Sequence, residues 1–235
     1  MNNQEKQAYI TYLKSRKSSH KTNYYLESLK EIKEIKEEFK DKKPKLLLHA
    51  CCAVCASWPL EFLSEVFDVT VFFNNSNIWP QSEHDRRLEE LKRYLIEEFD
   101  GDITVIERDY NYESYMEPLN PYKDDPEGWR RCFMCYTKRM DEAYHFASDH
   151  GYDFFTTVMS ISRQKDSQKM NEIGHALSKK YPNVRYFYSD FKKAGGQTRK
   201  NELSAKHDLY RQDYCGCKYS YINTHPDYND DQTQN

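Results

Sequence analysis

Apolar strand-like segments alternate with amphipathic helical segments along most of this chain, starting at Lys45. Short runs rich in Leu, Val, Ile and Phe are typical of buried strands, and the longer segments between them repeat their apolar residues every three or four positions. We expect strands at KLLLHA, VTVFF, ITVIERD, DFFTTVMS and VRYFYSD, and helices around 60–66, 82–99, 131–150, 167–180 and 198–210. Such alternation requires crossover connections between parallel strands. The sequence therefore predicts an α/β fold (HUP/Rossmann-like): an open parallel sheet with helices on both faces.

The chain of 235 residues is long enough for one sizeable domain with extra N- and C-terminal helices. Residues 1–44 are rich in Lys and Glu, and we predict that they form a helical extension packed on the domain through one apolar stripe. The stripe consists of Leu26, Leu29, Ile32, Ile35 and Phe39. We assign 45–222 to the α/β catalytic domain with its metal site, and the polar segment 223–235 to a disordered tail.

Composition indicates a cytoplasmic protein without a membrane partner. Charged residues make up 31% of the chain, and no apolar run approaches the roughly 20 residues that span a bilayer. The first residues, MNNQEKQAYITYLKSRKSS, lack the apolar core of a secretory signal. In a reducing cytoplasm, seven cysteines indicate metal or redox chemistry more often than structural disulfides. The net charge of −3 neither favours nor excludes nucleic acid.

The cysteines fall into three groups: C-C-x-x-C, C-x-x-C and C-x-C. The first group follows the strand that ends at Ala50, so it is expected at the crevice where the strand order reverses. Two groups start helices, whose N-termini favour thiolate over thiol. Paired thiolates suit zinc or an iron-sulfur cluster. A closed zinc site is an alternative, although it would leave three thiols unexplained. The members are Cys51, Cys52 and Cys55, then Cys132 and Cys135, then Cys215 and Cys217.

In motif order the chain resembles the cobalamin-independent epoxyqueuosine reductases, the QueH family. The resemblance covers about 44–221 and rests on LLLHACCAVC, NNSNIWPQSEHDRR, DPEGWRRCFMC, TTVMSIS and LYRQDYCGCKYS. It implies reduction of the epoxide of epoxyqueuosine at the tRNA wobble position to queuosine, the last step of queuosine biosynthesis. It also implies a [4Fe-4S] cluster and a nearby additional metal, a mononuclear iron or another divalent ion, with no cobalamin. The electron donor is unidentified.

The resemblance also assigns roles to individual residues. It implies that the metal-binding cysteines are Cys51, Cys52, Cys132 and Cys135, while Cys55 is a less secure ligand of the second metal. The matching polar residues, which we expect to contact substrate or tRNA, are Asn75, Asn77, Glu83, Arg87 and Gln212. The C-terminal signature adds Tyr210, Cys215 and Cys217. We expect the last two to alternate between dithiol and disulfide during turnover, since a C-G-C loop would make a strained and easily reduced disulfide.

Epoxide reduction also needs a proton donor and a surface for RNA. We expect His49, Tyr136 or Tyr210 to supply the proton. The anticodon loop is the expected partner, because sequence-selective RNA recognition usually targets splayed single-stranded bases. Phosphates would be bound by basic residues at the crevice, and the principal candidates are Arg163, Lys165, Arg199 and Lys200. Two rival functions are a zinc-stabilised RNA-binding module and an ATP-using tRNA thiolation enzyme on a similar scaffold. The second lacks support because HACCAVC offers no glycine-rich phosphate loop.

Overall fold

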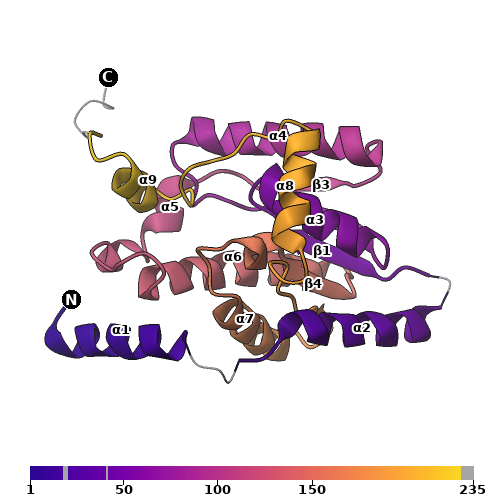
Figure 1. Cartoon of the computed structure of the whole chain (residues 1–235), viewed down its shortest axis with the longest axis horizontal. Helices are drawn as coiled ribbons and strands as arrows, with labels where there is room; N and C mark the ends of the chain where they lie inside the picture. Colours follow the sequence, from indigo (N-terminus) through magenta and orange to yellow (C-terminus); the bar gives the residue numbers. More distant parts are fainter. Residues whose placement is uncertain (18–20, 41, 229–235) are drawn as a thin grey trace.

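The computed structural model describes residues 1–17, 21–40 and 42–228, and its centre is a sheet of five parallel strands. The strand order is β3-β2-β1-β4-β5, which confirms the predicted open α/β sheet (Figure 1). β1 (Lys45–His49) lies in the middle, between β2 (Asp68–Phe73) and β4 (Phe154–Thr157). Along the chain, the strands on one side of β1, β2 and β3, come before those on the other side, β4 and β5. The order therefore reverses at the carboxyl ends of β1 and β4, where such sheets form their ligand crevice.

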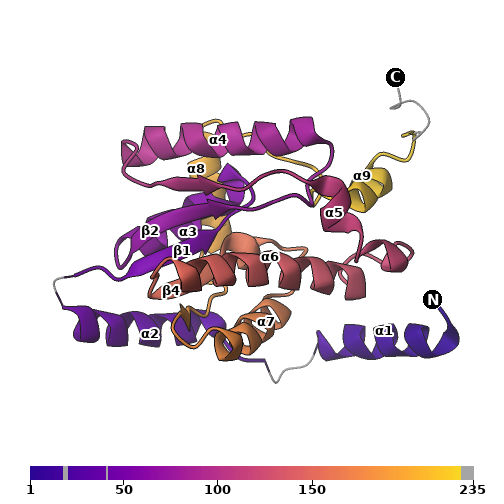
Figure 2. The ribbon, with the colours of Figure 1, turned by 180° about the vertical axis from the view of Figure 1, so that it is seen from behind.

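Helices cover both faces of this sheet, and its outer strands are β3 (Val105–Glu107) and β5 (Arg185–Tyr186) (Figures 1 and 2). The α-helices are α1 (Asn3–Ser15), α2 (Tyr24–Phe39), α3 (Ala53–Ser64), α4 (Gln81–Phe99), α5 (Tyr112–Met116), α6 (Arg130–Asp149), α7 (Ser167–Lys180), α8 (Gly196–Lys206) and α9 (Lys218–Thr224). Two 3₁₀ helices are η1 (Asn120–Tyr122) and η2 (Val158–Ile161). The three short elements α5, η1 and α9 have no counterpart in the sequence prediction.

The sheet separates two apolar cores. Leu46 and Leu48 of β1 point into the core formed with α2, α3 and α4, whereas Leu47 points into the core formed with α6 and α7. This alternation follows from the two-residue period of a strand. Each fully buried Leu contributes roughly 1.5–3 kcal/mol relative to an exposed one. Because β1 is buried on both faces, the loop that follows it has a fixed position.

The N-terminal extension consists of two helices, and only part of the predicted stripe on α2 is buried. Ile35 is buried, but Leu26 and Leu29 are 51% and 40% exposed. α2 instead turns Tyr24 and Ser28 inward, and the Tyr24 ring stacks on Tyr188 with centroids 5.7 Å apart. The prediction of one docked stripe was therefore wrong for its first two leucines.

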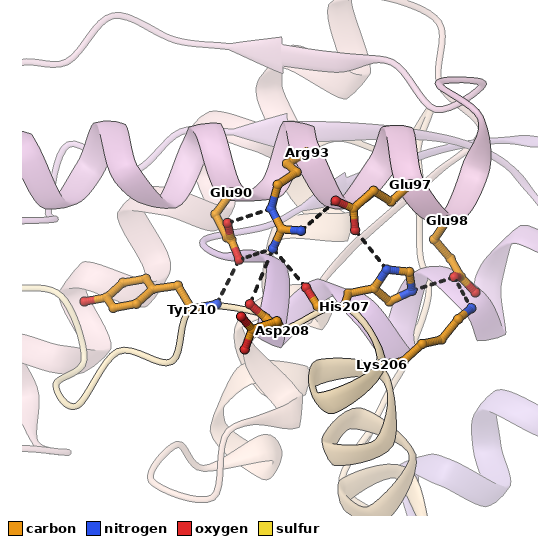
Figure 3. A network of polar contacts seen from close by, with 8 residues as sticks. All are labelled: Glu90, Arg93, Glu97, Glu98, Lys206, His207, Asp208 and Tyr210. Carbon is orange, nitrogen blue, oxygen red and sulfur yellow. Dashed lines mark hydrogen bonds and ion pairs between the residues drawn. The ribbon is translucent and has the colours of Figure 1, made fainter.

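One face of α4 binds the chain segment that follows α8 (Figure 3). The Arg93 guanidinium donates a hydrogen bond to the carbonyl oxygen of His207 at 3.0 Å. Asp208 has φ +46°, so α8 ends at Lys206 rather than at the predicted residue 210. The residues of this network are Glu90, Arg93, Glu97, Glu98, Lys206, His207, Asp208 and Tyr210. The start of the C-terminal segment is thus fixed to α4.

The predicted tail begins inside α9, because Asn223 and Thr224 belong to that helix. The His225 ring stacks on Tyr221 with centroids 4.1 Å apart. The rest of the predicted tail, 229–235, lies outside the described residues. Across the described ranges, no helix is both long and apolar enough to span a membrane.

Candidate active site

Three cysteines gather at the carboxyl end of β1. Cys51 lies two residues after the end of β1, Cys52 is the N-cap of α3, and Cys55 lies in the first turn of that helix. The Cys52 sulfur accepts a hydrogen bond from the Cys55 backbone N–H at 3.3 Å, and this contact caps the helix. The three sulfurs lie within 4.8 Å of one another. Within the described part of the chain, no other His, Cys, Asp or Glu side chains bring three ligand atoms this close. We call Cys51, Cys52 and Cys55 the thiol triad.

Two buried cations lie near the thiol triad. Lys165, which follows η2, is 8% exposed, and Arg139 of α6 is buried. Hydrogen bonds from Cys52 and Cys55, together with the charges of Lys165 and Arg139, hold the pKa of Cys51 well below its ordinary value. Burial opposes the charge on Lys165, but the nearby cysteines outweigh it and raise the pKa of this ammonium. The site therefore favours a thiolate at Cys51, the form of cysteine that binds metal. Hydrogen bonds with Cys51 raise the pKa values of Cys52 and Cys55 instead.

The other four cysteines form a second group, which we call the thiol quartet: Cys132, Cys135, Cys215 and Cys217. The first two begin α6, and the last two lie in the loop that leads into α9. Burial raises the pKa of Cys132 to about 11, with contributions from Cys215 and Cys135. Burial also raises the pKa of Cys217, and the other three thiols add to that effect. Cys135 and Cys215 therefore lie close enough to Cys132 and Cys217 to affect the ionisation of those two thiols.

The four predicted cluster ligands are divided between the two groups: Cys51 and Cys52 belong to the thiol triad, and Cys132 and Cys135 to the thiol quartet. Cys55, predicted as a ligand of a second metal, joins Cys51 and Cys52 instead, because three residues along a helix place it beside Cys52. Cys132 and Cys135 begin a helix on the opposite face of the sheet. Their neighbours are the cysteines of the C-G-C motif.

The loop that carries the C-G-C motif is held by α4 through two residues predicted to bind substrate. Arg87, 1% exposed, donates to Glu83 at 2.7 Å and to the carbonyl oxygens of Tyr214 and Cys215 at 3.5 and 3.4 Å. Gly216 has φ +125°, and a Cβ added there would lie 3.2 Å from a guanidinium nitrogen of Arg87. Only glycine fits this conformation and approach. Glu83 and Arg87 thus position the loop and are too buried to meet RNA, which corrects their predicted role.

None of the three predicted proton donors is placed for that role. Tyr136 is 3% exposed and does not line the cavity described below. The Tyr210 hydroxyl donates to Glu83 at 3.0 Å and does not line the cavity described below. His49 is completely buried, with Nδ1 2.9 Å from the Thr157 hydroxyl. Burial and the charge of Arg139 lower the pKa of His49 to about 3. The imidazole is therefore neutral at physiological pH and holds no acidic proton to give.

A cavity of about 600 Å³ opens beside the thiol triad and reaches both thiol groups. Its wall includes Cys51 and Cys55 of the triad and Cys215 of the quartet. Gln212 also lines it, and the amide donates to the Cys52 sulfur at 3.0 Å. Gln212 therefore remains a predicted substrate contact, and its side chain also binds the Cys52 thiol. We call this space the substrate cavity.

The wall of the substrate cavity is basic. It contains Arg163, Lys165 and Lys200, three of the residues predicted to bind phosphate, and also Arg211. Arg199 is absent from the wall, because Glu61 of α3 binds its guanidinium at 2.8 and 3.0 Å. Arg199 therefore does not belong with the phosphate-binding candidates.

The two predicted asparagines lie below the cavity rather than in its wall. Asn75 is buried, donates to the Ala50 carbonyl oxygen at 2.7 Å and accepts from Arg139 at 3.4 Å. It ties the end of β1 to the neighbouring loop. Asn77 is also buried, and its side-chain oxygen has no partner among the described residues. A role for either in direct contact with tRNA finds no support in this placement.

Two residues of the site were not predicted. Arg139 lies one turn after Cys135 on the buried face of α6, and an arginine among apolar helical positions is the signal that could have indicated it. The Tyr115 hydroxyl donates to the Cys135 carbonyl oxygen at 3.0 Å and lies 3.4 Å from its sulfur. Tyr115 belongs to α5, which the sequence did not indicate.

The fold and the site together define an α/β enzyme that uses thiolates at a crevice with a basic wall. The sequence model described as epoxyqueuosine reductase QueH matches residues 46–223. The chain belongs to the QueH family of epoxyqueuosine reductases. It is therefore an oxidoreductase of queuosine biosynthesis, and the two rival functions are set aside.

Individual relatives agree. The epoxyqueuosine reductase QueH of Streptococcus pyogenes serotype M1 is 36% identical over 186 residues, which cover 78% of this chain and 72% of that protein. The Haemophilus influenzae protein of the same name is 37% identical over 184 residues, covering 78% and 74%. The Thermotoga maritima protein is 30% identical over 183 residues, covering 75% and 90%. Among solved structures, the U34-tRNA thiolase NcsA from Methanococcus maripaludis with its [4Fe-4S] cluster has a TM-score of 0.44 and 13% identity, over 82% of this chain and 68% of that one.

Proposed function

We propose that the chain reduces the epoxide of epoxyqueuosine at the wobble position of tRNA within the substrate cavity, using a [4Fe-4S] cluster held by Cys51, Cys52 and Cys55. The observation that carries this proposal is the position of the triad: three sulfurs within 4.8 Å, two of them in the wall of a basic cavity. Thiolates are the usual protein ligands of iron-sulfur clusters, and three of them leave one cluster iron without a cysteine ligand.

The surroundings of the triad fit a group of this kind. Three buried polar atoms there have no hydrogen-bond partner among the described residues: His49 Nε2, Arg139 Nε and Gln212 Oε1. Unpaired buried polar atoms are rare in native structures and indicate a missing partner. Lys165 and Arg139 supply two positive charges that offset the negative charge of thiolate-bound iron and sulfide. A buried anionic group needs such cations nearby, because isolated buried anions are costly.

The thiol quartet supports two further proposals for this chain. Four soft thiols suit the additional metal, a mononuclear iron or another divalent ion. Alternatively, Cys215 and Cys217 form a redox-active pair that cycles between dithiol and disulfide. The two proposals differ in what serine variants of Cys215 and Cys217 lose: metal together with activity in the first case, activity alone in the second.

Removal of an epoxide oxygen to leave a carbon–carbon double bond takes two electrons and two protons and releases water. An iron-sulfur cluster held by the thiol triad would supply electrons singly, and a second metal would supply Lewis acidity. The protein's own contribution is electrostatic: the Lys165 ammonium in the cavity wall stabilises the negative charge that develops on the epoxide oxygen as its C–O bond breaks. A raised pKa keeps this ammonium protonated, so it is also positioned to donate a hydrogen bond.

The substrate enters as part of a polyanion, and the basic wall is suited to its phosphates. Arg163, Lys200 and Arg211 line the mouth together with Lys165. Among the described residues, Arg163 makes no ion pair, so its guanidinium is available to a phosphate. RNA affinity should consequently fall steeply with salt, since each neutralised phosphate releases counterions.

The test is conversion of tRNA carrying epoxyqueuosine by anaerobically reconstituted protein with dithionite as reductant. Mass spectrometry of the digested tRNA should show nucleoside that has lost one oxygen. Cys51→Ser should abolish conversion, whereas the surface substitution Lys92→Ala should leave it unchanged. Conversion that proceeds equally in Cys51→Ser would refute the site.

A further inference from the structure

A second basic cavity, of about 560 Å³, lies beside the substrate cavity and is completed by the N-terminal extension. We call it the N-terminal basin. Six cationic side chains line it: Arg16, Lys21, Arg163, Lys165, Lys192 and Lys193. The first two precede residue 46, where the match to the family begins. Arg16 and Lys21 therefore lie outside the part of the chain that matches the family model.

We propose that the N-terminal basin binds the phosphodiester backbone of the tRNA substrate, so that Arg16 and Lys21 of the N-terminal extension form part of the RNA-binding surface. This inference rests on the proposed function and extends it to residues outside the family match. It is carried by three features of the basin: its charge, its continuity with the substrate cavity and the fixed position of α1.

The two carboxylates that line the N-terminal basin do not balance the positive charge of its six cationic side chains. Its two carboxylates are already engaged: Asp166 accepts from Tyr12 at 3.1 Å and pairs with Arg16 at 3.5 Å, and Asp190 accepts from Ser167 at 2.9 Å and pairs with Lys192 at 3.2 Å. The other four cations make no ion pair with any described carboxylate. They are Lys21, Arg163, Lys165 and Lys193. An excess of unpaired positive charge in a concave surface attracts a polyanion.

The basin continues into the substrate cavity. Arg163, Lys165 and Gln197 line both spaces. Lys165 is more than nine-tenths buried, and its ammonium makes no hydrogen bond to the described residues. A nucleotide chain with one base in the substrate cavity can therefore pass its neighbouring phosphates along a continuous basic surface. A flat surface that binds an acidic protein would not need to continue into the substrate cavity.

The extension holds its cations in place. α1 ends beside the start of α7 (Figures 1 and 2), where Arg16 and Tyr12 contact Asp166, the N-cap of that helix. The Tyr12 ring packs 5.0 Å from Trp129 and 5.1 Å from Phe133. Gln168 also donates to the Thr22 carbonyl oxygen at 2.8 Å, just after Lys21. These contacts fix both ends of the cationic segment.

The experiment measures binding of full-length substrate tRNA at several salt concentrations. The test variant is Arg16→Ala/Lys21→Ala in the full chain, and the matched control is Lys6→Ala/Lys14→Ala, which removes two charges from exposed positions of α1 outside the basin. Each phosphate contact changes the slope of log K against log salt by about 0.7–0.9, or affinity by roughly five- to eightfold at 0.1 M salt. The test variant should therefore lose about 25- to 60-fold in affinity and flatten the slope by about 1.4–1.8. The control should match wild type.

A third variant separates phosphate contact from docking of α1. Tyr12→Phe removes the hydrogen bond to Asp166 without changing charge, and it should keep the wild-type slope. An equal loss in Tyr12→Phe, or a wild-type slope in Arg16→Ala/Lys21→Ala, would overturn the inference. If that double variant binds tRNA normally but loses turnover with a flavodoxin-type donor while dithionite still drives it, the basin serves a protein and the RNA proposal is wrong. If wild type itself fails to convert epoxyqueuosine tRNA, the proposed function fails first.

Discussion

Replacement of Arg87 by methionine tests how the C-G-C loop is positioned. Arg87 and its partner Glu83 are both buried, at 1% and 7% exposure, and their ion pair is 2.7 Å long. Methionine retains most of the volume but leaves the Glu83 carboxylate buried with only the Tyr210 hydroxyl as a donor. Breaking one partner of a buried pair costs about 3–5 kcal/mol. The two long bonds to the carbonyl oxygens of Tyr214 and Cys215 add little to this figure.

Urea unfolding of Arg87→Met should therefore show a loss of about 3–5 kcal/mol, a large part of the 5–15 kcal/mol typical of a domain. The double variant Arg87→Met/Glu83→Gln should recover at least about 2 kcal/mol, because it removes the stranded charge. Alkylation of Cys215 should be faster in Arg87→Met than in wild type. A loss below about 1 kcal/mol, or full additivity in the double variant, would show that this pair does not hold the loop.

Three other changes probe separate parts of the account. Burial raises the pKa of Glu31 from 4.5 to about 7, so the folded state keeps this proton to a higher pH than the unfolded chain, and stability falls as pH rises from 4.5 to 7. Glu31→Gln should therefore stabilise the protein by about 1–3 kcal/mol at pH 8 and not at pH 4. Equal effects at both pH values in urea unfolding would contradict this. Gly216→Ala forces a side chain to φ +125° against Arg87, so thermal unfolding should show a loss of about 1–3 kcal/mol, and an unchanged midpoint would refute the packing. Gln212→Leu removes a hydrogen bond to the Cys52 sulfur and should make the reduction potential of the iron-sulfur group more negative; redox titration with an unshifted potential would exclude this contact.

The local features of the site were predictable, because they depend on short stretches of sequence. Apolar runs and helical periodicity placed β1 in a parallel sheet and Cys51 just beyond its carboxyl end. The C-x-x-C spacing placed Cys52 and Cys55 on one side of a helix start. Each of these depends on neighbours within a few residues.

The pairings between distant segments were not predictable. Arg87 contacts carbonyl oxygens about 128 positions away, and nothing in the motif around it shows that it is buried. Cys132 and Cys135 have the same spacing as Cys52 and Cys55, so spacing could not show that Cys215 and Cys217 lie beside them. Leu26 and Leu29 fit an apolar stripe, yet α2 packs through a neighbouring face. Tertiary packing decides all three, and sequence periodicity does not contain it.

The assignment of the cluster to Cys51, Cys52 and Cys55 is the central claim, and iron content with visible absorption of the anaerobically purified protein tests it most directly. Cys55→Ser should be compared with Cys132→Ser, which makes the same chemical change at another helix start. The account predicts that Cys55→Ser loses the broad iron-sulfur absorption, while Cys132→Ser retains it. Retention of the full spectrum in Cys55→Ser together with its loss in Cys132→Ser would contradict the account and restore a cluster held by Cys132.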